Sequence, residues 1–86
     1  MLETSTLTVV VRNKDKVLYL GHASGVTAVN DKGPFDILQQ HENFISLIKG
    51  KIIIHVTPKE NQEIQIENGI VRVYKDKVYI YVNFAA

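Results

Sequence analysis

Hydrophobic and polar residues alternate along most of this chain, in short runs rich in valine, isoleucine and tyrosine. The run LTVVVR at 7–12, for example, sets Leu7, Val9 and Val11 against Thr8, Val10 and Arg12. A period of two is typical of a β-strand with one buried face. Turn-forming residues separate the runs about every 8–12 residues, a spacing expected of a sandwich or barrel. We therefore predict an all-β fold.

The other runs with this character are VLYLGH, GVTAV, KIIIHVT, EIQIE, IVRVY and VYIYV. Glycine, proline or asparagine bounds most of them, and Asn68-Gly69 is a strong turn signal. Only the segment Gln39–Ile48 could support a helical turn, and it is too short for a stable helix by itself.

The last two runs form the clearest hairpin in the chain, joined by Lys-Asp-Lys at 75–77. Alternation places Val71, Val73, Val78, Ile80 and Val82 on one face. The opposite face carries basic and aromatic residues, namely Arg72, Tyr74, Lys77, Tyr79 and Tyr81. Such a face could stack single-stranded bases. The favoured interpretation is that the tyrosines pack in cross-strand pairs or contact a protein.

Length and composition limit the function classes. Eighty-six residues, 45% of them hydrophobic, suffice for one core, and we expect residues 1–86 to form a single domain. The net charge of +1 gives no reason to expect nucleic acid or an acidic membrane as the main partner. Without cysteine, neither a disulfide nor a thiolate metal site is possible. The sequence has no secretory signal pattern and no apolar run of membrane-spanning length, so we expect a soluble protein without direct membrane insertion.

No catalytic, metal or cofactor site is predicted. The histidines His22, His41 and His55 are far apart in the sequence, and none has a second ligand at metal-binding spacing. His55 lies within IIIHVT and is expected to be structural. The serines are in no nucleophile motif, and the glycines are spaced as turn residues rather than as a phosphate-binding loop. We therefore expect no enzymatic activity and no cofactor.

The stretch GPFDILQQHENF, Gly33–Phe44, interrupts the strand-like pattern. It resembles a stretch of the epsilon subunit (delta in mitochondria) of the proton-translocating ATP synthase that reads roughly G-x-[FL]-G-I-L-P-G-H-x-x-[FL]. The matching residues are Gly33, Phe35, Ile37, Leu38, His41 and Phe44. The segments VLYLGHASGVTAV, GKIIIH and IENGIVRVYKDKVYIYV are similar to further segments of that family in the same order. The resemblance covers about residues 7–82.

The resemblance implies a flattened β-sandwich of about ten short strands. It also implies a non-catalytic role in the central stalk, or rotor, of the synthase, where such subunits bind the gamma subunit and the c-ring and help couple proton flow to ATP synthesis. The expected location is cytoplasmic, peripheral to the inner (plasma) membrane through the complex. The family usually continues into two C-terminal helices, whereas this sequence stops at NFAA, so no C-terminal helical hairpin is expected.

Two substitutions distinguish this chain from the family pattern. Asp36 replaces a glycine, and Gln39-Gln40 replaces a Pro-Gly pair, so the segment should be less rigid or differently shaped. This change motivates an alternative function, a stand-alone β-sandwich adaptor that has diverged to an unrelated protein partner.

We interpret Gly33–Phe44 as a presented turn whose apolar residues, Phe35, Ile37 and Phe44, fill the core. The candidate residues for contact with gamma or the c-ring are Asp31, Lys32, Gly33, Pro34, Asp36, Gln40, His41 and Glu42. His41 could instead hold the turn by a hydrogen bond to the backbone. The alternative contact face is that of the last hairpin, with Arg72, Tyr74, Lys77, Tyr79 and Tyr81.

Overall fold

The computed structural model describes residues 6–39 and 42–83, which contain seven β-strands. The strands are β1 (Leu7–Arg12), β2 (Val17–Ala23), β3 (Gly25–Asn30), β4 (Gly33–Leu38), β5 (Phe44–Thr57), β6 (Glu60–Tyr74) and β7 (Lys77–Val82). All of them join one hydrogen-bonded sheet in the order β2-β1-β7-β6-β5-β3-β4. Only β1 and β7 are parallel neighbours among these strands. The predicted all-β class is confirmed.

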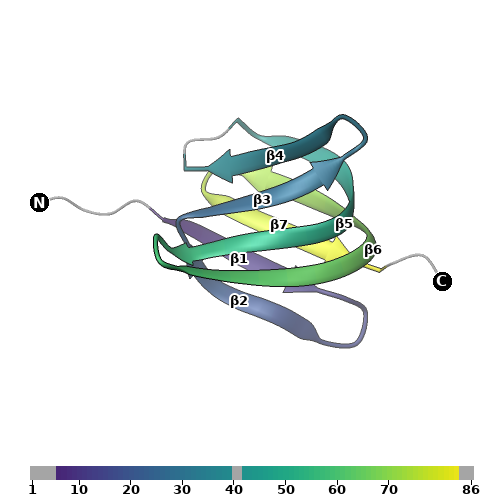
Figure 1. Cartoon of the computed structure of the whole chain (residues 1–86), viewed down its shortest axis with the longest axis horizontal. Helices are drawn as coiled ribbons and strands as arrows, with labels where there is room; N and C mark the ends of the chain where they lie inside the picture. The colour runs from purple at the N-terminus through teal and green to yellow at the C-terminus, as the bar shows by residue number, and fades with distance from the viewer. Residues whose placement is uncertain (1–5, 40–41, 84–86) are drawn as a thin grey trace, which may run out of the picture.

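The sheet folds over into two layers because its two longest strands pass from one layer to the other (Figure 1). β5 and β6 pair along most of their lengths, and the register shifts between Ile48 and Gly50. Before this bend β5 pairs with the half of β6 that leads on to β7 and β1, and after it β5 pairs with β3. We call the two halves the β1–β7 layer and the β3–β4 layer. The sandwich is as expected, but it has fewer than ten strands because β5 and β6 are continuous through the bend.

Two glycines permit this bend. Gly50 has a φ of 82°, in the left-handed region that residues with a Cβ rarely adopt. Gly69 pairs with Ile48 on the other strand. A Cβ at Gly69 would lie 3.1 Å from the carbonyl oxygen of Tyr81 and 3.2 Å from Cγ1 of Ile48. Gly50 therefore supplies the backbone conformation, and Gly69 supplies the close approach of the strands.

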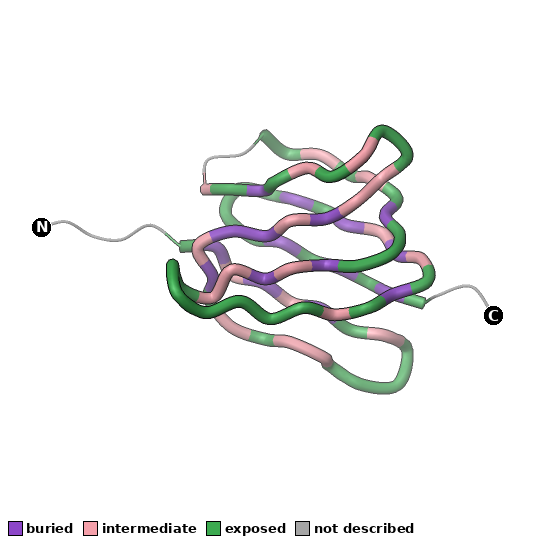
Figure 2. The backbone as a smooth tube through the Cα atoms, in the orientation of Figure 1, coloured by how far each residue is buried: buried purple, intermediate pink, exposed green. Residues whose placement is uncertain are grey.

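Aliphatic side chains fill the space between the layers. Buried and more exposed positions alternate along the strands (Figure 2). The predicted inward face of the last hairpin is confirmed, since Val71, Val73, Val78, Ile80 and Val82 are all buried. In the described part of the chain no polar or charged side chain is buried. The core is therefore held by the removal of apolar surface from water.

The helical turn that Gln39–Ile48 could support does not form over Phe44–Ile48. Phe44–Ile48 is the first part of β5 and pairs with Gly69–Val73 of β6. A short segment cannot hold a helix alone, and the cross-strand partners satisfy its backbone groups in the extended form.

Within the ranges 6–39 and 42–83 there is no helix with the length and apolar character needed to cross a bilayer.

Candidate protein-binding surface

The interpretation of Gly33–Phe44 as a presented turn is wrong for its first half. Gly33–Leu38 is β4, an edge strand that pairs only with β3 in the described sheet. Pro34 suits an edge strand because proline has no N–H to give to a neighbour. The turn between β3 and β4 consists of Asp31 and Lys32, before this stretch.

The apolar residues of this stretch follow the strand alternation. Ile37 is fully buried, as expected, and Leu38 is exposed. Phe35 and Phe44 pack edge to face, with ring centroids 5.8 Å apart and an interplanar angle of 70°. Both rings are only half-buried, although we expected them in the core. An edge strand has a neighbour on one side only, so the ring of Phe35 is covered less completely than a central side chain.

Polar groups hold the β3–β4 turn in shape. The side-chain oxygen of Asn30 accepts a hydrogen bond of 2.8 Å from the Lys32 N–H, and Gly33 has a φ of 115°. The Asp31 carboxylate lies 3.4 Å from Nζ of Lys49, and both side chains are largely exposed. Exposed ion pairs contribute little to stability, so Asp31 can exchange this contact for one with a partner.

The remaining candidates from the sequence are Pro34, Glu42, Gln40 and His41. Pro34 and Glu42 are exposed. Gln40 and His41 lie outside the described residues, so their contact role, and the alternative structural role of His41, remain predictions.

Asp36 is exposed but belongs to a chain of hydrogen bonds across the β3–β4 layer. The Thr27 hydroxyl donates to the Asp36 carboxylate at 2.6 Å, and the same oxygen lies 2.8 Å from Nε2 of His55. The Thr27 hydroxyl oxygen therefore links Asp36 to His55. Nδ1 of His55 lies 3.0 Å from Oδ1 of Asn61. His55 is therefore structural, as predicted, and Asp36 belongs to the sheet surface rather than to a turn.

This arrangement differs from that of an activated nucleophile. In a hydroxyl–histidine–carboxylate triad the hydroxyl donates to the histidine, whereas here the Thr27 hydroxyl donates to the carboxylate. Among residues 6–39 and 42–83, no three His, Cys, Asp or Glu side chains are grouped so that they could hold a metal ion.

The outer face of the β1–β7 layer is rich in apolar side chains. The strand register aligns three rows across it, Leu20–Val10–Tyr79–Arg72–Ile45, Arg12–Tyr81–Ile70–Leu47 and His22–Thr8–Lys77–Tyr74. We call the surface formed by these residues the apolar face. Leu20, Ile45 and Leu47 are 69%, 63% and 66% exposed. Aliphatic side chains gathered in this way mark an interaction site more often than scattered ones do.

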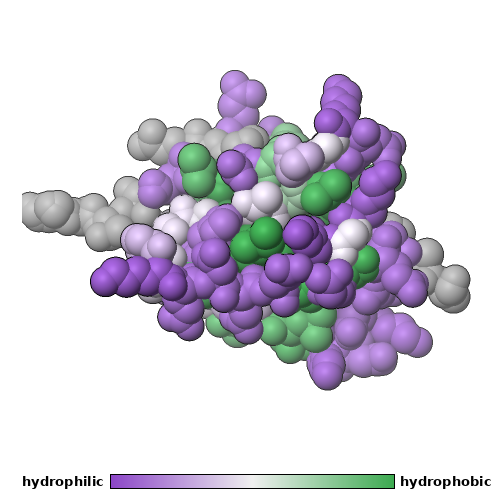
Figure 3. Space-filling model, viewed as in Figure 1, coloured by the Kyte–Doolittle hydropathy of each residue, from purple (hydrophilic) through white to green (hydrophobic). Residues whose placement is uncertain are grey.

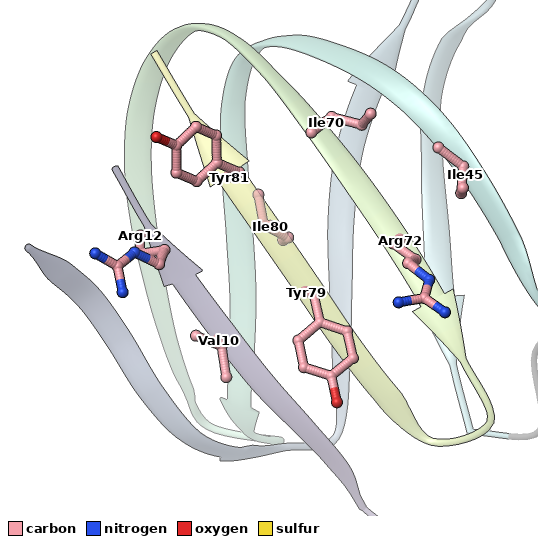
Figure 4. A pocket seen from close by; sticks show the side chains of 8 residues that line it. All are labelled: Val10, Arg12, Ile45, Ile70, Arg72, Tyr79, Ile80 and Tyr81. Carbon is pink, nitrogen blue, oxygen red and sulfur yellow. The ribbon is translucent and has the colours of Figure 1, made fainter. Parts of the chain in front are cut away.

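The apolar face is hollowed at its centre. A shallow pocket of about 320 Å³ lies between side chains of β1, β5, β6 and β7. Arg12 and Arg72 lie on opposite sides of it, with the ring of Tyr79 between them (Figure 4). Cζ of Arg72 is also 5.6 Å from the centroid of the Tyr74 ring, within the range of a cation–π contact.

The outer surface of the β3–β4 layer has a different character. Hydrophilic residues cover most of it, and apolar residues appear only in small, separate areas (Figure 3). Its described residues include the hydrogen-bonded Thr27, Asp36 and His55 and the ion pair of Lys51 with Glu63, at 3.9 Å. The outer surface of the β3–β4 layer is therefore suited to contact with water, and the apolar face to contact with a protein.

The hairpin face predicted from the sequence is one part of the apolar face. Arg72, Tyr74, Lys77, Tyr79 and Tyr81 are all exposed there, as the alternation indicated. The prediction missed the other members of this face, namely the apolar Val10, Leu20, Ile45, Leu47 and Ile70 and the polar Thr8, Arg12 and His22. Alternation in 7–12 already placed Val10 and Arg12 together, but it could not show which strand lies beside them.

Comparison with known proteins agrees with this architecture. A family model described as "ATP synthase, Delta/Epsilon chain, beta-sandwich domain" matches residues 6–86. The ATP synthase epsilon chain of Sulfurimonas denitrificans is 30% identical over 82 residues, covering 94% of this chain and 63% of the relative. That of Corynebacterium glutamicum is 27% identical over 81 residues, covering 92% and 65%. This chain thus spans less than two thirds of the length of either relative.

Solved structures show the same fold. A chain in the Euglena gracilis mitochondrial ATP synthase (OSCP/F1/c-ring) superposes with a TM-score of 0.86 at 15% identity, covering 96% of this chain and 54% of that one. A chain in the central stalk/c-ring structure of the Tetrahymena thermophila mitochondrial ATP synthase gives 0.74 at 18% identity, covering 94% and 66%. Given the family match along nearly all of its length, the chain belongs to the β-sandwich domain family of ATP synthase delta/epsilon chains.

Proposed function

We propose that this chain is a central-stalk, or rotor, domain of a proton-translocating ATP synthase that binds the gamma subunit and the c-ring. Its role is non-catalytic, and it meets the membrane only through the complex. Family membership supports the proposal. The observation that carries it is the apolar face, which the described part of the chain leaves uncovered.

The apolar face is assigned to the gamma subunit. Leu20, Ile45 and Leu47 are each more than half exposed, so a covering protein removes a large apolar area from water. Tyrosine and arginine are enriched at the energetic centres of protein interfaces, and here Tyr79 and Arg72 lie side by side in the register. The shallow pocket that both residues help to line can receive a protruding side chain of the partner.

The β3–β4 turn is assigned to the c-ring. Asp31 and Lys32 form an exposed, polar tip, which suits the polar loops expected of that partner. The turn is tied to the apolar face at β5, because Nδ2 of Asn30 donates to Oγ of Ser46 at 3.3 Å, and Ser46 lies between Ile45 and Leu47. Partners bound at the turn and on the apolar face would therefore be neighbours, as gamma and the c-ring are in a stalk.

The proposal is tested by titrating the chain with purified gamma subunit from the same organism. Ile45→Asp should weaken binding at least about tenfold, because it puts a charge into the apolar contact. The matched control is Leu38→Asp, at an apolar side chain that is 56% exposed on the β3–β4 layer. This control should bind gamma within about twofold of the unaltered chain. Thermal melts show that both variants fold.

Equal weakening by the two variants would contradict the assignment of the apolar face. A chain that does not bind gamma, and that captures neither gamma nor c subunits from its native cell, would contradict the rotor proposal itself. A different protein captured through the apolar face would then favour the diverged adaptor.

A further inference from the structure

The charged residues of the apolar face all have the same sign. Its outward strand positions include Arg12, Arg72 and Lys77 and no aspartate or glutamate. At the edge, the β6–β7 turn adds the cation Lys75, with Nζ 5.5 Å from the centroid of the Tyr74 ring, and the anion Asp76. The whole chain has a net charge of only +1, so the outward strand positions of this face are more basic than the molecule as a whole.

The two arginines have no carboxylate partner in the described part of the chain. The ion pairs found there are those of Lys49 with Asp31 and Lys51 with Glu63. Arg12 donates from Nε to the backbone oxygen of Asn13 at 3.1 Å, and Arg72 contacts the ring of Tyr74. Most N–H groups of both guanidinium ions are thus directed to solvent.

Covering the apolar face would remove that solvent. A guanidinium ion that loses its water without gaining acceptors is strongly unfavourable, so a purely apolar partner surface is a poor fit. Arginine binds carboxylates through two parallel hydrogen bonds, which restores the lost interactions and fixes the orientation. Here Arg12 and Arg72 lie on opposite sides of one pocket.

We propose that the partner surface that docks on the apolar face is an apolar patch with carboxylates at its rim, placed to meet Arg12 and Arg72. This inference rests on the proposed function and names the chemistry that gamma must present. It also assigns roles within the interface. The aliphatic and tyrosine side chains supply the buried area, and the arginines select the partner and fix its register.

The test is the titration with purified gamma at about 50 mM and about 300 mM salt, because contacts between charged groups weaken as salt rises. The unaltered chain should bind gamma severalfold more weakly at the higher salt concentration.

Arg72→Glu should lower the affinity at about 50 mM salt about tenfold or more. Arg72→Lys should lower it by less, since lysine keeps the charge but loses the paired hydrogen bonds. Arg12→Gln should reduce the salt dependence. The control is Lys59→Glu, an exposed position in the β5–β6 turn, which should bind within about twofold of the unaltered chain.

The outcomes separate the two proposals. If the unaltered chain binds gamma, and if the arginine variants bind equally well with no salt dependence, the acidic rim is wrong while the rotor function stands. If the chain does not bind gamma at all, both proposals fall. Tight binding of a single-stranded oligonucleotide that is lost in Arg72→Glu, together with no effect of this variant on gamma, would overturn the acidic protein partner in favour of nucleic acid.

Discussion

Neighbouring residues on the same strand have opposite roles in this molecule. In β4, Ile37 is fully buried and Leu38 is 56% exposed, although both are apolar and adjacent. The same holds in β7, where Val78 and Ile80 are buried while Tyr79 and Tyr81 form part of the apolar face. Side-chain type alone therefore does not tell a core residue from a contact residue, but the register does.

Truncation of these two neighbours should give unequal results. Ile37→Ala should lower the free energy of unfolding by about 2–4 kcal/mol, because it leaves a cavity among close-packed side chains. Leu38→Ala should cost about 1 kcal/mol or less, since water already reaches that side chain. Urea unfolding of both variants measures the difference. Equal losses would mean that β4 does not have the register described.

The hydrogen bonds of Thr27 give a second prediction at this scale. Thr27→Val keeps the shape of the side chain but removes the hydroxyl that links Asp36 and His55. The free energy of unfolding should fall by about 1–2 kcal/mol, because Nε2 of half-buried His55 then lacks its hydrogen-bond partner. Thr8→Val is the control, since the Thr8 hydroxyl has no hydrogen bond within the described residues. A silent Thr27→Val would show that the chain of hydrogen bonds adds nothing to stability.

The element that organises the sandwich is the pair of bent strands, β5 and β6. Their bend lets one continuous pair belong to both layers, so it connects the polar β3–β4 surface with the apolar face. A sheet of this length without a bend would expose the aliphatic side chains that now fill the core.

The bend should depend on its glycines. Gly50→Ala should cost about 1–2 kcal/mol because of the positive φ, and Gly69→Val about 2 kcal/mol or more because the added atoms meet Ile48 and the Tyr81 backbone. Gly21→Ala is the matched control, since the nearest atoms to its Cβ would be those of the Tyr19 side chain, at ordinary contact distances of 3.5 Å (hydroxyl oxygen) and 3.7 Å (ring). Thermal melts give the ranking. Comparable stability of all three variants would contradict this account of the bend.

Some strands of this sheet could be predicted from the sequence and others could not. Both faces of the last hairpin could be predicted, because its strands are adjacent in sequence and strongly alternating. Gly33–Leu38 was expected to be a presented turn because Gly33-Pro34 is a turn signal, yet it pairs with the preceding strand β3 across a two-residue turn. Within Gln39–Ile48 the pattern allowed a helical turn, whereas Phe44–Ile48 is extended because Gly69–Val73, far along the chain, supplies its cross-strand partners. Most of the apolar face was missed for the same reason. The parallel pairing of β1 with β7, which sets Val10 beside Tyr79, joins segments at opposite ends of the chain and leaves no local signal.

At the scale of the whole molecule, the two outer surfaces differ in kind. The β3–β4 layer carries polar groups that satisfy one another, whereas the apolar face carries exposed aliphatic side chains and arginines without carboxylate partners. A domain that is polar on one side and apolar on the other is suited to being held against a larger protein. The central claim is that the apolar face is the side that gamma covers.

The most direct test is the solvent accessibility of methyl groups by NMR, measured with a soluble paramagnetic agent on the chain alone and bound to gamma. The methyl groups of Leu20, Ile45 and Leu47 should be reached by the agent in the free chain and protected in the complex. Those of Leu38 and Ile53, on the β3–β4 layer, should keep the same accessibility in both states. Protection of Leu38 and Ile53, with Leu20, Ile45 and Leu47 still accessible in the complex, would show that gamma binds the opposite surface and would contradict this account.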